Sequence, residues 1–183
     1  ILPLYIILLA VLPFVLLGFR LWPAAVLAVS FGLWGAVQFD KNLALAAYPG
    51  PNQVWFFNPF SWQALFFLGA WCGWRRLKGE IPWLTNRWLF RLALAGALAG
   101  FLIRFSWTLH RFYDPFPALF SRALLPLLIK TNLGILRFAN VLVLALLAAR
   151  LISPQAKFLT GRAAQPFIMC GRHSLHIFCL GIL

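Results

Sequence analysis

The sequence predicts an all-α protein, a polytopic transmembrane helix bundle of about six helices that forms a single membrane domain over residues 1–183. Three observations predict this fold. Of the 183 residues, 63% are hydrophobic and only 10% are charged, with a mean hydropathy of +0.87, whereas a soluble domain has about 25% charged residues. The apolar residues form runs long enough to cross the roughly 30 Å hydrocarbon layer. The period-2 alternation of a barrel strand is absent, so backbone groups in lipid must be satisfied within helices.

The predicted spans follow one another with charged or turn-forming residues between them. In order they are Ile1–Phe19, Leu21–Phe39, Val54–Trp74, Trp88–Leu109, Leu133–Ala149 and a sixth that begins near Phe167 and is unfinished at Leu183. Both ends of the chain fall inside apolar runs. We therefore expect the chain to be a fragment of a larger bundle, in which further helices precede it and the last helix continues beyond it.

Basic residues between the spans predict the orientation. The net charge of +13 comes from 16 Lys and Arg against three acidic residues, and alternate connections carry ten basic residues on one side and six on the other. Because cytoplasmic loops are enriched in Lys and Arg, the side that holds Arg20, Arg75 and Arg150 is predicted to be cytoplasmic. Lipid phosphates then account for the positive charge, so the predicted partner is a lipid bilayer and not a nucleic acid.

The two predicted outer connections differ from the inner ones. The range 40–53 contains AAYPGPNQ, a turn-forming run of Pro, Gly and Asn. The range 110–132 contains FYDPFPALFSRALLPLLIK, in which prolines interrupt an aromatic and aliphatic stretch. Since this second connection is too apolar for a free loop, we predict that it lies in the membrane interface or dips back into the bundle.

The third span opens with NPFSWQ, an unusually polar start for a membrane helix. Pro59 suits the first helical turn, where its missing N–H costs nothing, and Asn58 then falls at the N-cap. On this interpretation Trp62 is an aromatic of the interface belt. Gln63 lies one turn beyond the cap, and a buried amide needs partners or water. Two interpretations therefore stay open for this segment: helix capping with an aromatic belt, or a polar surface that faces a substrate cavity.

Two arginines make the outer half of the fourth span basic. Arg104, Thr108 and Arg111 share one helical face at i, i+4 and i+7. Arg104 can reach the interface by extending its side chain along the helix. Alternatively, Arg104 and Arg111 line an outward-facing pocket for an anionic group.

The last two spans also carry polar groups. Arg137 and Asn140 lie at i and i+3, on one helical face. Arg137 can be an interfacial anchor and Asn140 an interhelical hydrogen-bonding group, or both can line a hydrated cavity. The sixth segment contains Arg172, His173 and Ser174. His173 is the candidate catalytic residue, because a histidine at the membrane can act as a general base or a proton relay near neutral pH, although a lone histidine is more often structural.

Other chemistries are excluded by what the sequence lacks. The three cysteines show no zinc-ligand spacing, so no metal site is predicted. The three acidic residues lie away from the middle of any predicted span, which argues against paired-carboxylate chemistry and against a proton-coupled carrier. These three residues are Asp40, Glu80 and Asp114.

Three motifs in order are familiar: FNPFSWQALFFLGA, LIKTNLGILRFANVLVLALLAARLI and CGRHSLHIFCLGIL. They resemble the later part of the OpgC family of bacterial inner-membrane proteins, relatives of the membrane acyltransferase-3 enzymes, over essentially the whole chain. The resemblance implies a multi-pass protein of the bacterial inner membrane that transfers a succinyl-like acyl group to osmoregulated periplasmic glucan. It further implies an acyl-CoA donor on the cytoplasmic side, a carbohydrate acceptor outside and no bound cofactor.

The resemblance also implies which residues matter. The motif positions carried over are Asn58, Trp62, Gln63, Arg172, His173 and Ser174. The family's catalytic histidine is expected near the first helix of the full protein, which precedes this chain, so the chain by itself is expected to be inactive. We expect the amides, guanidiniums and imidazoles of the chain to converge on one hydrated chamber that opens away from the cytosol.

Two rival hypotheses stay open. A carrier or flippase for an envelope lipid or polysaccharide precursor would use Arg104, Arg111 and Arg137 to hold an anionic head. A non-catalytic membrane scaffold would use the same residues only as interfacial anchors.

Overall fold

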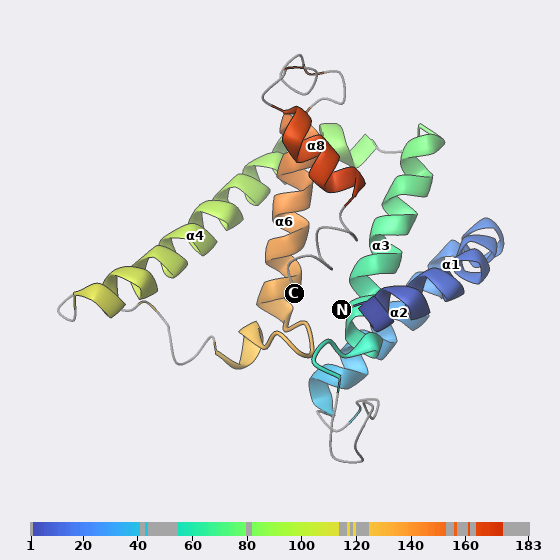
Figure 1. Cartoon of the computed structure of the whole chain (residues 1–183), viewed down its shortest axis with the longest axis horizontal. Helices are drawn as coiled ribbons and strands as arrows, with labels where there is room; N and C mark the ends of the chain where they lie inside the picture. Colours follow the sequence, from blue (N-terminus) through green and yellow to red (C-terminus); the bar gives the residue numbers. More distant parts are fainter. Residues whose placement is uncertain are drawn as a thin grey trace.

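A computed structural model describes residues 2–40, 43, 55–79, 82–113, 117, 119, 125–152, 156, 161 and 164–173 (Figure 1). Over those residues the secondary structure is entirely helical, which confirms the predicted all-α class. A helix lies in each of the six predicted segments: α1 (Leu2–Leu21), α2 (Pro23–Phe39), α3 (Pro59–Leu77), α4 (Arg87–Phe112), α6 (Ile135–Leu151) and α8 (Gln165–Arg172). Two short 3₁₀ helices, η1 (Pro82–Thr85) and η2 (Pro126–Leu128), lie in the connections.

Two of the described helices are long and apolar enough to cross a membrane. They cover Pro3–Leu21, in α1, and Arg87–Phe112, which is α4. Helix α2 is apolar but shorter, at 17 residues. Both spanning candidates bury little of their surface inside the protein, and the exposed side chains of α1 include Ile6, Phe14 and Leu17.

Local chemistry sets several helix boundaries, and the helices differ from the predicted spans at several of them. Helix α3 starts at Pro59 and not at Val54, because the Asn58 side chain caps it and proline disfavours a helical residue before it. Helix α6 starts at Ile135 and not at Leu133, since Leu133 adopts a left-handed φ of 46°. Helix α4 extends beyond Leu109 to Phe112.

Helices α1, α2 and α3 form one packed group. Helix α2 runs in the opposite general direction to α1 and α3, and their axes cross at an angle (Figure 1). The core between them contains Leu4, Leu8 and Phe19 of α1 with Phe67 of α3. Phe19 also stacks on Trp74, with ring centroids 6.3 Å apart. These contacts hold the first turns of α1 and α3 at the same end of the bundle.

Helix α6 connects this group to α4. Phe138 of α6 packs against Trp34 of α2, with ring centroids 5.1 Å apart, and lies in one core cluster with Ala64 and Leu133. Helix α4 packs antiparallel on α6, where Arg150 Nη1 donates to the carbonyl oxygens of Leu84 at 2.8 Å and Asn86 at 3.0 Å. Figure 1 shows α4 diverging from α6 toward its C-terminal end.

Cations and aromatic rings gather where α3 and α6 end and α4 begins, which we call the basic end. Four cations lie over aromatic rings there, at 3.9–5.6 Å from the ring centroids: Arg75 over Trp71, Lys78 over Trp74, Arg91 over Trp88 and Arg150 over Phe90. Paired cationic and aromatic side chains are typical of a membrane–water interface. The opposite end of the bundle, which carries Asn58 and Asn132, we call the amide end.

Candidate functional site

Asn58 is the centre of a buried polar cluster at the amide end. Its side chain is fully buried and uses both of its polar atoms. The Oδ1 atom accepts from the backbone N–H of Phe60 at 3.1 Å, which caps α3 as the sequence predicts. The Nδ2 atom donates to the carbonyl oxygen of Leu43 at 2.8 Å and to Oδ1 of Asn132 at 3.3 Å. Asn58 therefore joins three segments that lie far apart in the sequence.

Gln63 joins α3 to α2, one turn deeper in the bundle. Only 6% of its surface is exposed. Its Oε1 accepts from the Ser30 hydroxyl at 2.6 Å, while its Nε2 donates to the carbonyl oxygens of Ser30 at 2.7 Å and Phe60 at 3.0 Å. The amide is satisfied by protein groups, so in this structure Gln63 fastens two helices and does not face a cavity.

Residues 129–134, which we call the anchored loop, receive donors from α2 and α3. The Thr131 carbonyl accepts from the Asn58 backbone N–H at 3.1 Å and from Trp62 Nε1 at 3.2 Å. The Leu133 carbonyl accepts from Trp34 Nε1 at 3.0 Å. The described part of the long apolar connection thus dips back onto the bundle, as predicted.

The anchored loop contains one strained residue. Leu133 is fully buried with a left-handed φ of 46°, a conformation that costs a non-glycine residue about 1–2 kcal/mol. The hydrogen bonds that the Leu133 and Thr131 carbonyls accept from Trp34 and Trp62 hold Leu133 in this conformation, because a change of its backbone would break them.

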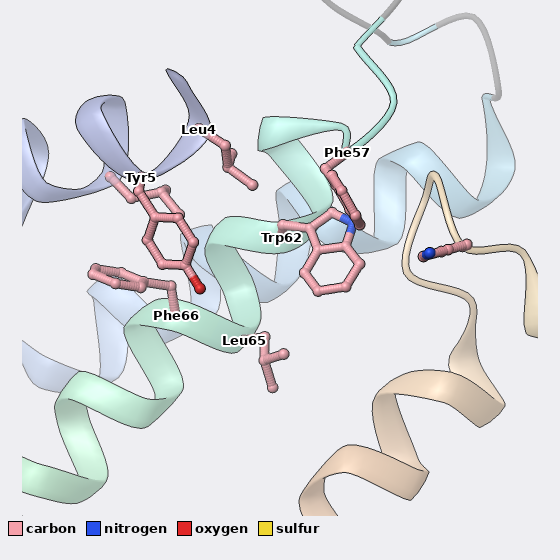
Figure 2. A pocket seen from close by; sticks show the side chains of 8 residues that line it. Leu4, Tyr5, Phe57, Trp62, Leu65 and Phe66 are labelled. Atoms are coloured by element: carbon pink, nitrogen blue, oxygen red, sulfur yellow. The ribbon is translucent and has the colours of Figure 1, made fainter. Parts of the chain in front are cut away.

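A pocket of about 470 Å³ lies beside the polar cluster, between α1 and α3 (Figure 2). Leu4, Tyr5 and Leu8 of α1 face Trp62, Leu65 and Phe66 of α3 across it. Phe57 and Lys130 complete its lining. The volume is within the range of small-molecule sites, about 300–1,000 Å³, but the walls are almost entirely apolar.

Three of the predicted site residues meet at this place and the others lie elsewhere. Asn58, Trp62 and Gln63 come together at the amide end. Arg137 lies close by on α6, where its Nε and Nη2 donate to the Leu128 carbonyl at 3.3 and 3.2 Å. Asn140 is exposed one turn further along α6, beside Gly100 of α4. Arg137 thus positions the segment before the anchored loop.

The remaining candidates are exposed on other helices. Arg104 and Arg111 lie on α4, and the Thr108 hydroxyl donates to the Arg104 carbonyl at 3.0 Å. Arg172 and His173 are exposed at the C-terminal end of α8. Ser174 lies outside the described residues. The described candidates therefore occupy separate places and do not surround one chamber, because they lie on different helices. The amides of Asn58 and Gln63 are in addition already used in bonds between segments of the bundle.

Sequence reasoning missed the partners of these amides. Ser30 and Gln38 of α2 are both hydrogen-bonded across the bundle, Gln38 Nε2 to the Asn132 carbonyl at 2.8 Å. A signal for them was available, since Ser30, Trp34 and Gln38 repeat every four residues along one face of an otherwise apolar helix. Lys130 and Tyr5 were also missed, because nothing in their local sequence indicates a pocket.

Metal chemistry finds no support among the described residues, which contain no group of three or more His, Cys, Asp or Glu that could hold an ion. Cys72 and Cys170 are both free. The arrangement supports hydrogen bonding, aromatic stacking and cation contacts at the amide end.

The comparisons with known proteins give one positive result. The family model described as OpgC protein matches residues 1–183. No curated protein matches the chain, and no solved structure matches it.

Proposed function

The chain belongs to the OpgC family, and from this premise we propose that it is part of a multi-pass O-acyltransferase of the bacterial inner membrane. The acyl group is succinyl-like and comes from an acyl-CoA on the cytoplasmic side. The acceptor is a hydroxyl group of osmoregulated periplasmic glucan or a related envelope carbohydrate. The family match over residues 1–183 is the observation that carries the proposal.

The membrane placement is supported by the surface of the helices. Large apolar side chains are exposed along α1 and along α4, among them Phe14, Leu17, Leu98 and Phe101. Contiguous apolar surface of this kind is unusual on a protein that meets only water. The cation–aromatic pairs of the basic end suit the headgroup layer of an anionic cytoplasmic leaflet. The amide end then faces the periplasm.

The orientation leads to a labelling prediction. In a full-length protein whose native cysteines are replaced by alanine, Tyr113→Cys after the last turn of α4 should react with a membrane-impermeant maleimide added to intact spheroplasts. Lys78→Cys at the basic end should react only after the membrane is permeabilised. Both side chains are exposed, so accessibility within the protein is matched. The opposite labelling pattern would show that the orientation is inverted.

The proposed reaction has defined requirements. The glucan hydroxyl oxygen bonds to the thioester carbonyl carbon, the C–S bond breaks, and the coenzyme A thiolate leaves. A base takes the hydroxyl proton, and hydrogen-bond donors stabilise the oxyanion. In this chain Arg104 and Arg111 are exposed on the last turns of α4, at the end of that helix opposite the basic end, where a guanidinium suits the carboxylate of a succinyl group.

Acyl incorporation tests the function directly. The full-length protein is expressed in cells that make periplasmic glucan but lack their own acyltransferase, and the glucan is analysed by mass spectrometry. We expect glucan carrying ester-linked acyl groups, lost on mild alkaline treatment. Unmodified glucan in the presence of correctly inserted protein would contradict the proposal, and movement of an unmodified precursor across the membrane would favour the carrier hypothesis.

A charge variant extends the same assay. Arg104→Ala should lower acyl incorporation by about tenfold, which corresponds to the loss of one charge-assisted contact. Arg76→Ala is the matched control, because Arg76 is also an exposed arginine and lies at the basic end. Equal incorporation in the two variants would remove Arg104 from the site.

A further inference from the structure

We propose that the pocket between α1 and α3 binds one anionic phospholipid, with an acyl chain between the helices and the headgroup phosphate at Lys130. The proposal rests on the membrane placement given above but not on the acyl transfer. The pocket lies beside the polar cluster. Trp62 belongs to both, because its ring forms one wall of the pocket and its indole N–H donates to the Thr131 carbonyl.

The walls of the pocket select an apolar occupant. Leu4 and Leu8 on one side and Leu65 and Phe66 on the other offer only hydrocarbon surface. The indole N–H of Trp62 is already bonded to the Thr131 carbonyl at 3.2 Å. A sugar placed here would bury several hydroxyl groups without partners, and each unpaired group would oppose binding. An acyl chain loses no hydrogen bonds in the same space.

One cation lies at the rim of the pocket. Lys130 is exposed, and its Nζ lies 5.2 Å from the ring centroid of Phe56 and 5.7 Å from that of Phe57. These rings hold the ammonium group beside the pocket. Lys130 follows η2 at the amide end, the level at which lipid headgroups are expected in the proposed orientation. A single cation at the mouth of an apolar pocket complements an anionic head on an apolar chain.

The pocket is reached from the side of α1. Tyr5 lines it and is 50% exposed, and its neighbours Ile6 and Leu9 are also exposed. Figure 2 shows Tyr5 and Phe66 on opposite helices at one side of the pocket. Because the exposed surface of α1 is apolar, its surroundings in a membrane are lipid chains. A chain can then enter sideways from the bilayer.

Photo-crosslinking tests the proposal in the full-length protein. The protein is reconstituted in phosphatidylcholine vesicles with a small fraction of phosphatidylglycerol that carries a diazirine at the end of one acyl chain. After irradiation, we expect cross-links concentrated in the peptides that contain Leu4–Leu8 and Trp62–Phe66. Unlabelled phosphatidylglycerol should compete, whereas added phosphatidylcholine and inorganic phosphate should not.

Two pairs of variants make the test specific. Lys130→Gln should reduce cross-linking about fivefold, the effect of removing one basic residue near an anionic headgroup. Lys78→Gln, which removes another exposed lysine packed on an aromatic ring, should leave it unchanged. Leu65→Trp should abolish cross-linking by filling the pocket, and Leu92→Trp on the exposed face of α4 should not.

Several results would overturn the proposal. Cross-links spread evenly over the exposed helices would mean ordinary boundary lipid. Absence of cross-links in both pocket peptides would mean that another part of the full-length protein fills the space. Competition by inorganic phosphate would mean an anion site without a lipid. If Leu65→Trp fails to fold, the comparison of cross-linking in Lys130→Gln and Lys78→Gln tests the proposal alone, and equal cross-linking in these two variants contradicts it. Acyl incorporation is measured separately, so the two proposals can fail independently.

Discussion

Replacing Gly134 by alanine is expected to destabilise the protein by about 3 kcal/mol or more, through forced displacement of packed backbone. A Cβ atom at this position would overlap the carbonyl oxygen of Leu127 and would lie 3.1 Å from the backbone nitrogen of Ile129. Both neighbours are backbone, so no side chain can turn away. The carbonyl that would be pushed aside lies next to that of Leu128, the acceptor of both Arg137 hydrogen bonds.

The measurement is the thermal unfolding of the purified full-length protein in detergent, at one protein concentration and heating rate. Gly69→Ala in α3 is the matched control, because a Cβ at Gly69 meets nothing within 4 Å. Since alanine favours a helix over glycine, this control should be neutral or stabilising. A Gly134→Ala protein that unfolds at the control's temperature would show that residues 129–134 do not pack as described.

The substitution Gln63→Leu is expected to have the second largest effect, a loss of about 1–3 kcal/mol of stability. Leucine cannot accept the hydrogen bond that the Ser30 hydroxyl donates to Gln63 Oε1 at 2.6 Å, nor donate one to the Ser30 carbonyl. Since Gln63 is buried at the α2–α3 contact, water cannot replace these bonds. The variant should therefore lose acyl incorporation through loss of folded protein, and not through a damaged substrate contact.

A double-mutant cycle separates these two explanations. Ser30→Ala removes the hydroxyl that donates to Gln63. In the double variant both side-chain partners of this hydrogen bond are absent, so neither is left buried without its partner. We expect the double variant's loss of stability to be smaller than the sum of the two single losses by at least about 0.5 kcal/mol. Strictly additive losses would contradict the hydrogen bond. Full stability of Gln63→Leu with lost acyl transfer would instead return Gln63 to the substrate site.

The fold was predictable to the extent that it depends on local chemistry. Composition and run length were enough to place a helix in each apolar segment, and the order of Asn58 and Pro59 was enough to predict how α3 starts. The boundary of α6 was not predictable in this way, because the left-handed conformation of Leu133 depends on an indole 99 residues away in the sequence.

The candidate site was predictable only in part, for a related reason. Gln63 and Ser30 are 33 residues apart, and sequence alone does not show that they meet. When Ser30 is not recognised as its partner, the buried amide of Gln63 suggests a contact with a substrate. For Arg137 the sequence leaves an interfacial anchor and the lining of a wet cavity both open, and in the structure its guanidinium donates to the Leu128 carbonyl. A polar residue in an apolar segment indicates a partner but not its identity.

The long separation between donors and acceptors at the amide end constrains the order of assembly. The indole of Trp62 and the amide of Gln38 bond to carbonyls that follow them by 69 and 94 residues. During synthesis, helices α2 and α3, which carry these donors, emerge well before those carbonyls exist. The polar groups of these two helices must bond to water or to a temporary partner until residues 129–134 arrive and fix α2 and α3 in place.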